Sequence, residues 1–132
     1  MRLVLQRAAG DCGIAGLATL LEQSYEDVYL HAAGIEPVHR GKLGIHIPAL
    51  QRIAKACGSA LAVKATAGDD DEGLLIVKWR RGSRHYRGAA FRQHLIAIGY
   101  GVAVDPADGL VLPLDEYLDR ERATAGTFLE LQ

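Results

Sequence analysis

The sequence contains only two cysteines, and it has neither an excess of one charge nor a long hydrophobic run. Two cysteines are too few for a disulfide framework, which indicates a reducing compartment. With 15 basic and 16 acidic residues the formal net charge is −1, so no overall field attracts nucleic acid or an acidic membrane. No uncharged apolar run approaches the roughly 20 residues that span a bilayer. The opening MRLVLQR has too few consecutive apolar residues for a secretion signal. We therefore expect a cytoplasmic protein without a membrane span.

The length and the apolar content predict one packed core. The chain has 132 residues, of which 49% are hydrophobic. This is a common size for one domain that folds around one core. The sequence has no internal repeat and no low-complexity tract, and we expect a single domain over residues 1–132.

The first predicted helix begins just after Asp11. An aspartate is a good N-cap, because its carboxylate can accept the free N–H groups of the first turn. Apolar residues then recur at the spacing of an amphipathic helix. They are Ile14, Leu17, Ala18 and Leu21. Ala15 and Gly16 lie among them and would allow a neighbouring element to pack closely.

Two more helices are predicted before the middle of the chain. Ser24 begins a weak variant of the capping box, and this helix stops at Gly34. The glycine- and proline-containing segment 35–44 is predicted to be a loop. A third helix fits residues 46–57, with Gly58 suited to the position after its end.

After Gly58 the pattern changes from helical to extended. Strands are predicted at 60–64, 74–79, 91–98, 102–105, 110–112 and 127–131, with a helical turn at 114–120. An acidic turn at 68–73 separates the first two strands. Because helices come first and strands later, the predicted fold class is α+β, with N-terminal helices packed on a C-terminal antiparallel sheet.

Cys12 is a candidate nucleophile because of its place at the start of the first predicted helix. The N-terminus of a helix carries a partial positive charge, which favours a thiolate over a thiol. A nearby Asp11 carboxylate would partly oppose this effect. The alternative is that Cys12 is only a small apolar residue within the helix.

A thiolate nucleophile needs a base, and His94 is the candidate whose direction a predicted strand would fix. The other histidines are His31, His39, His46 and His85. If the following turn is Gly99-Tyr100, then Ile98 pairs with Gly101, and counting back places His94 opposite Asp105. Directly opposed residues share a face, with Cβ atoms about 5 Å apart, which is how an aspartate orients a histidine. A turn at Tyr100-Gly101 would shift this register, and a purely structural His–Asp pair is the alternative interpretation.

Gln6 is a candidate oxyanion donor. A thiolate that attacks a carbonyl creates an oxyanion, which fixed N–H donors stabilise. The Gln6 amide and the backbone N–H of Cys12 are both candidates for this. Taken alone, a glutamine at this position would be assigned to the surface.

Together these residues resemble the bacteriocin-processing cysteine peptidases, the papain-like domains that cleave double-glycine leader peptides. The shared features are a glutamine, an Asp-Cys-Gly-x-Ala helix start, a His-apolar-apolar strand and an Asp-Pro-x-x-Gly turn. In this sequence they are Gln6, Asp11-Cys12-Gly13-Ile14-Ala15, His94-Leu95-Ile96 and Asp105-Pro106-Ala107-Asp108-Gly109. The segments from Gly44 to Leu50 and from Ala54 to Val63 also resemble the family, so the resemblance covers nearly the whole chain.

The resemblance implies a free-standing bacterial cysteine peptidase with a papain-like fold. It would act on a peptide or protein substrate through a thioester acyl-enzyme and would need no cofactor. Cys12 would be the nucleophile, His94 the base and acid, Asp105 the orienting residue and Gln6 the oxyanion donor. An interaction module that has kept the fold without cutting, and a transamidase that passes the acyl group to an amine, are the alternatives.

A basic stretch at 78–92 lies outside the resemblance. Its cations are Lys78, Arg80, Arg81, Arg84, Arg87 and Arg92, and it contains no acid. Because few aromatic residues accompany these charges, we expect a solvated loop and not a nucleic-acid site. We expect Trp79 to belong to the core or a cleft wall and Cys57 to be a buried core thiol. The histidines and cysteines show no zinc spacing, so no metal is predicted. The sequence does not predict an oligomeric state.

Overall fold

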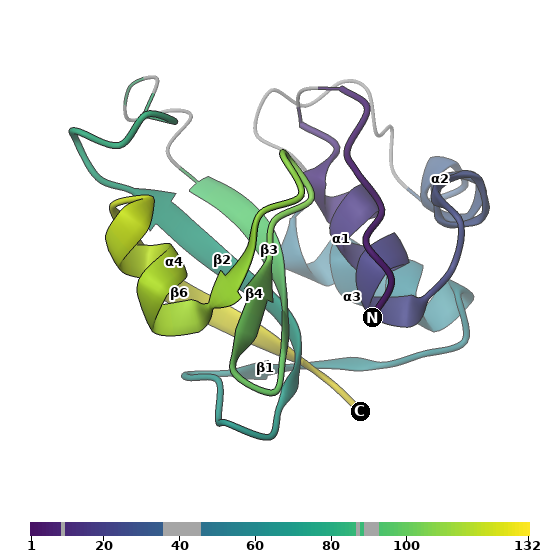
Figure 1. Cartoon of the computed structure of the whole chain (residues 1–132). Helices are drawn as coiled ribbons and strands as arrows, with labels where there is room; N and C mark the ends of the chain where they lie inside the picture. The colour runs from purple at the N-terminus through teal and green to yellow at the C-terminus, as the bar shows by residue number, and fades with distance from the viewer. Residues whose placement is uncertain (9, 36–45, 87, 89–92) are drawn as a thin grey trace.

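A computed structural model describes residues 1–8, 10–35, 46–86, 88 and 93–132. Within these residues four helices and six strands form an α+β fold (Figure 1). The helices are α1 (Cys12–Leu21), α2 (Tyr25–Ala33), α3 (Ile47–Ala56) and α4 (Leu114–Arg120). The strands are β1 (Leu61–Lys64), β2 (Glu72–Trp79), β3 (Gln93–Gly99), β4 (Val102–Val104), β5 (Val111–Pro113) and β6 (Ala123–Leu131). Most of the predicted loop at 35–44 and the predicted strand start at 91–92 lie outside the described residues. No helix in the described part of the chain has the length and apolar character needed to cross a membrane.

The strands form one antiparallel sheet in the order β1-β6-β2-β3-β4-β5. The acidic turn after β1 does not pair β1 with β2, because the last strand of the chain, β6, lies between them. The sequence pattern indicates strands but not this order, since inserting a C-terminal strand depends on contacts far apart in the chain.

The sheet carries a separate hydrophobic cluster on each face. Helices α1 and α3 pack on one face of the sheet, α1 against side chains such as Leu74 and Leu95, and α2 packs against these two helices, so the layer of N-terminal helices is as predicted. Helix α4 packs on the other face, where Tyr117 joins Ile96, Ile98 and other strand residues. Figure 1 shows the sheet between α4 and the three N-terminal helices. The predicted layer of helices is therefore confirmed, and α4 adds a second layer.

Helix α1 lies unusually close to the sheet. Its residues from Gly13 to Leu20 are all buried, so α1 is a buried helix and not an amphipathic helix with one exposed face. A Cβ atom at Gly16 would lie 2.6 Å from Leu95 Cδ2 and 3.3 Å from Leu74 Cδ2. The predicted close approach at Gly16 is confirmed, and this contact holds the start of the helix beside the start of β3.

The other predicted helix boundaries agree with the structure. The Ser24 hydroxyl caps α2 by accepting a hydrogen bond from the Asp27 N–H at 3.1 Å. Helix α3 ends at Ala56 with Cys57 as its C-cap residue, and Gly58 follows with a positive φ of 90°.

Candidate active site

Cys12 is the first residue of α1 and is half-buried. Its backbone N–H has no acceptor among the described residues, as is usual for the first residue of a helix. The thiol interacts with the His94 imidazole, which raises the pKa of that histidine. The candidate nucleophile and the candidate base, far apart in the sequence, therefore meet in the fold.

The prediction that the Asp11 side chain caps α1 is wrong. Its buried Oδ2 instead accepts hydrogen bonds from Arg7 N–H at 2.9 Å, Ala8 N–H at 3.1 Å and the Tyr25 hydroxyl at 2.7 Å. These donors precede the helix or come from α2, so Asp11 fixes the loop that leads into Cys12. The first-turn N–H groups of α1 therefore do not bond to the Asp11 carboxylate. They remain available to stabilise an anion formed at the start of the helix.

The imidazole of His94 lies against Asp105. Its Nε2 is 2.7 Å from Asp105 Oδ1, and the ring is only 10% exposed. Burial lowers the pKa of His94, but the hydrogen bonds to Asp105 and Cys12 outweigh it and raise the pKa to about 10. Because Nε2 is engaged with Asp105, Nδ1 is the ring nitrogen that remains to serve Cys12.

The register from which this pair was predicted is wrong. The turn is Tyr100-Gly101, with φ values of 51° and 78°, and Ile98 pairs with Ala103 instead of Gly101. Two consecutive left-handed residues form the two-residue turn that best matches the twist of a hairpin. Continuing this register would place Asp105 opposite Ile96, diagonal to His94.

The pair forms in spite of this, because the register differs from the predicted one by two residues. Side chains alternate with a period of two along a strand, so a shift of two keeps Asp105 on the same face as His94. Diagonal neighbours on one face are about 7–8 Å apart at Cα, which a histidine and an aspartate can bridge. Strand β4 also ends at Val104, one residue earlier than predicted, so Asp105 leaves the strand toward His94.

Asp105 is fully buried and its carboxylate is held by three donors. Oδ1 accepts from His94 and from the Ala107 N–H at 2.9 Å, and Oδ2 accepts from the Tyr117 hydroxyl at 2.6 Å. Burial raises the pKa of Asp105, but its hydrogen bonds to His94 and Tyr117 lower it further, so the net shift is downward. The paired charges are thus ionised together over a wide pH range.

Tyr117 was missed by the sequence analysis. It lies on α4, is fully buried, and its pKa is raised far above the ordinary value by burial and by the neighbouring Asp105. The hydroxyl therefore remains a proton donor to Asp105. Only the tertiary packing of α4 places it there, although a tyrosine inside the predicted helical turn is a weak signal for a buried hydroxyl that needs a partner.

Trp79 covers the histidine side of the site. It is buried, and its ring stacks on His94 at a centroid distance of 5.2 Å and on His85 at 4.5 Å. The expectation of a core or cleft-wall residue is confirmed. The stacking excludes water from the His94–Asp105 pair and fixes the plane of the imidazole.

Gln6 lies next to the Asp105 turn through its backbone. Its N–H donates to the Pro106 carbonyl at 2.8 Å, and its Nε2 donates to the Ala8 carbonyl at 3.1 Å. The described interactions contain no contact between the Gln6 amide and Cys12. The predicted oxyanion role of Gln6 therefore stays a prediction.

Two further features differ from what the sequence predicted. One is the burial of Cys57, and the other is a group of side chains that could ligate a metal. Cys57 is half-buried at the end of α3, so the prediction of a buried core thiol is only partly correct. His85, Asp108 and Glu121 bring possible ligand atoms within 4.8 Å of one another, a grouping that no sequence spacing indicated. The Arg84 guanidinium already bonds to both carboxylates of this group.

The comparisons with known proteins concern the fold. No protein-family model and no curated protein matches the sequence. One similar solved structure is a double-glycine motif protease from an AMS/PCAT transporter in complex with the leader peptide. It has a TM-score of 0.62 and 20% identity, over 98% of this chain and 89% of that one. Another is the peptidase domain of Streptococcus ComA, a bi-functional ABC transporter involved in a quorum sensing pathway. It has a TM-score of 0.60 and 16% identity, over 98% of this chain and 96% of that one.

This chain has the fold of the double-glycine peptidase domains. The α+β arrangement of the peptidase fold agrees with the fold class predicted from the sequence. Within that fold the start of α1, the start of β3 and the residue after β4 converge. A thiol beside an imidazole that is kept charged by a buried carboxylate is an arrangement suited to nucleophilic attack by sulfur.

Proposed function

We propose that this protein is a cysteine peptidase that cleaves a peptide substrate through a thioester intermediate. The observation that carries the proposal is the chain of contacts from Cys12 through His94 to Asp105 and Tyr117. A module that only binds its partner has no need for a histidine whose charge is maintained beside a thiol. The peptidase fold of the structural neighbours supports the same conclusion.

In the acylation step the Cys12 sulfur attacks the carbonyl carbon of the scissile amide. A C–S bond forms, and the oxyanion lies near the start of α1, where the Cys12 N–H and the Gln6 amide are the proposed donors. As the C–N bond breaks, His94 gives its proton to the leaving amine. Asp105 stabilises the imidazolium before this transfer and orients the ring throughout.

In the deacylation step a water molecule takes the place of the amine. His94, now neutral, accepts a proton from that water, and the resulting hydroxide attacks the thioester carbon. The C–S bond breaks, the acid product leaves, and the proton on His94 restores the starting pair with Cys12. If an amine took the place of water, the same intermediate would give a transamidase.

The test is the cleavage of internally quenched peptides that carry a central Gly-Gly, a sequence chosen because of the structural neighbours. We expect cleavage by the wild-type chain, none by Cys12→Ala, and a trapped thioester mass on Cys12 when the substrate is an activated ester. The matched control is Cys57→Ala, which should cleave like the wild type. No acyl adduct on Cys12 with any ester or peptide, in a folded protein, would leave only the interaction module.

A further inference from the structure

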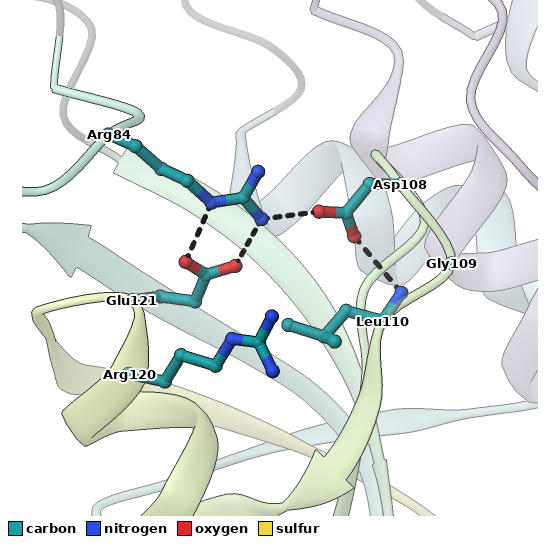
Figure 2. Close-up of a pocket in the computed structure, with 6 residues that line it drawn as sticks. All are labelled: Arg84, Asp108, Gly109, Leu110, Arg120 and Glu121. Carbon is teal, nitrogen blue, oxygen red and sulfur yellow. Dashed lines mark hydrogen bonds and ion pairs between the residues drawn. The ribbon is translucent and has the colours of Figure 1, made fainter.

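Four arginines surround the end of α4, and the proposed chemistry does not use any of them. We define the arginine cluster as Arg80, Arg81, Arg120 and Arg122, all of which are exposed. Arg80, Arg81 and Arg122 line a pocket of about 290 Å³ together with Asp119. Arg120 lines a neighbouring pocket of about 600 Å³, and Figure 2 shows its guanidinium extended toward Leu110.

The cluster carries positive charge that the described residues do not neutralise. None of its four guanidinium groups lies within ion-pair distance of a carboxylate among these residues. Arg84 is different, because it forms two hydrogen bonds to the buried Glu121 and one to Asp108 (Figure 2). Within the basic stretch seen in the sequence, Arg84 is therefore a structural arginine, whereas Arg80 and Arg81 are available to an anionic ligand. Arg87 and Arg92 lie outside the described residues.

The backbone fixes where this set lies. The Arg80 N–H donates to the Arg122 carbonyl at 2.8 Å, which joins the end of β2 to the start of β6. Arg122 has a positive φ of 51°, a backbone conformation that residues other than glycine rarely adopt. Gly82 packs against its guanidinium, since a Cβ there would lie 2.7 Å from Arg122 Nη1. The charges are thus presented by a constrained turn.

The cluster begins beside the candidate active site, on its histidine side. Val77 pairs with His94, and Arg80 lies three residues further along the chain, just after the end of β2. At about 3.3 Å per residue this is a displacement of roughly 10 Å, equal to about three residues of an extended peptide. Because His94 would protonate the leaving amine, we take the peptide on the carboxyl side of the scissile bond to leave on the His94 side of the site.

From this placement we propose that the arginine cluster binds acidic side chains of the substrate, about three residues after the cleaved bond. The inference rests on the proposed peptidase function and adds a charge preference to it. An acidic peptide fits better than a nucleic acid because Trp79 is buried against two imidazoles and cannot stack on a base.

The experiment measures binding to the Cys12→Ala protein by fluorescence anisotropy, so that cleavage does not interfere. The probes are short labelled Gly-Gly peptides with a block of glutamates after the Gly-Gly, the same block before it, or glutamines in place of the glutamates. At low salt we expect the first to bind about tenfold tighter than the glutamine peptide, because several exposed ion pairs add together. At about 1 M salt, where the screening length is about 3 Å, the difference should disappear.

The variants assign the effect to the cluster. Arg81→Gln combined with Arg122→Gln should remove the preference for the acidic peptide, and Arg120→Gln tests the second pocket separately. The matched control is Arg52→Gln, an exposed arginine on α3, which should keep the preference. Thermal melting of each variant verifies folding.

The outcomes separate this inference from the proposed function. Equal binding of the glutamate and glutamine peptides, equal preference for both block positions, or tighter binding of a single-stranded oligonucleotide would overturn the inference, even if wild-type protein cleaves. Charge-dependent binding that Arg81 and Arg122 control would support acidic recognition, even if the wild-type protein cleaves nothing and the peptidase proposal fails.

Discussion

His94 Nε2 lies 2.7 Å from Asp105 Oδ1, although the two residues are not directly opposed in the sheet. The pair exists because both side chains extend from the same face and Asp105 is released from β4 into a turn. The turn is itself closed by Asp105, whose carbonyl accepts from the Gly109 N–H at 2.8 Å. The carboxylate therefore has a fixed position before any substrate binds.

Replacing Asp105 with asparagine should lower kcat by several orders of magnitude, while the fold remains intact. The amide is similar in size but carries no charge to stabilise the imidazolium, and it can hold the ring in the wrong tautomer. The measurement is kcat and KM on the peptide that the wild type cleaves. Asp108→Asn is the control on the same turn, and equal loss in both variants would contradict the orienting role of Asp105.

Tyr117→Phe should destabilise the protein by about 1–2 kcal/mol, because a buried carboxylate loses one hydrogen bond. It should also raise the pKa of Asp105, since one of the donors that lower it is removed. Chemical denaturation measures the first effect, and the acid limb of the pH–rate profile measures the second. Tyr29→Phe, on α2, is the control; an unchanged acid limb in Tyr117→Phe would contradict a positioning role.

The stability contributed by His94 should depend on pH in a defined direction. Its pKa is about 10 in the folded chain against 6.5 ordinarily, so folding favours its protonated form. The contribution is present in full below about pH 6.5 and is lost as the pH rises toward about 10. The pKa of Asp105 is lowered in the folded chain, so its contribution to stability is present near neutral pH and is lost in strong acid.

Melting curves of the wild type and His94→Gln measured across this range test the expectation. The difference in Tm between the two should be largest near pH 6 and should fall as the pH rises toward 10, leaving only the part that the packing of the ring on Trp79 contributes. A difference that is constant from pH 6 to pH 10 would mean that the imidazole is not held in its charged form.

The two thiols should react very differently with iodoacetamide. Cys12 lies beside a histidine that stays charged at neutral pH, so it should be alkylated faster than Cys57 at neutral pH. Burial and the nearby Asp27 raise the pKa of Cys57, so that thiol should react slowly. Peptide mass mapping reads the two sites in one sample. Equal slow labelling of both would favour the interaction module.

Arg84→Ala should destabilise the chain by about 2 kcal/mol, because it leaves the buried Glu121 carboxylate with the His85 ring as its one remaining partner among the described residues. The denaturation free energy measures this loss. Adding Glu121→Gln to Arg84→Ala should recover most of the stability, since the buried charge is then absent. If the double variant is as unstable as the sum of the two single variants, the pair is not coupled.

The sequence by itself determined the elements and the chemical types that meet in the site. The helical spacing behind Cys12, the cap at Ser24 and most strand positions follow from local patterns, because periodicity and capping are properties of neighbouring residues. The expected Asp11 cap of α1 does not form. The same local alternation placed His94 and Asp105 on one face, even though the predicted turn was wrong by one position. The face on which a side chain lies depends on whether its position along the strand is odd or even. A shift of two residues in the pairing therefore left both side chains on the same face.

Only the tertiary structure decided which distant groups complete the arrangement. The insertion of β6 between β1 and β2, the Tyr117 hydroxyl on Asp105, the stacking of Trp79 on His94 and the use of Asp11 by the preceding loop all join residues far apart in the chain. Such contacts depend on how the layers pack and on which buried polar atoms then need partners. No local pattern in the sequence contains that information.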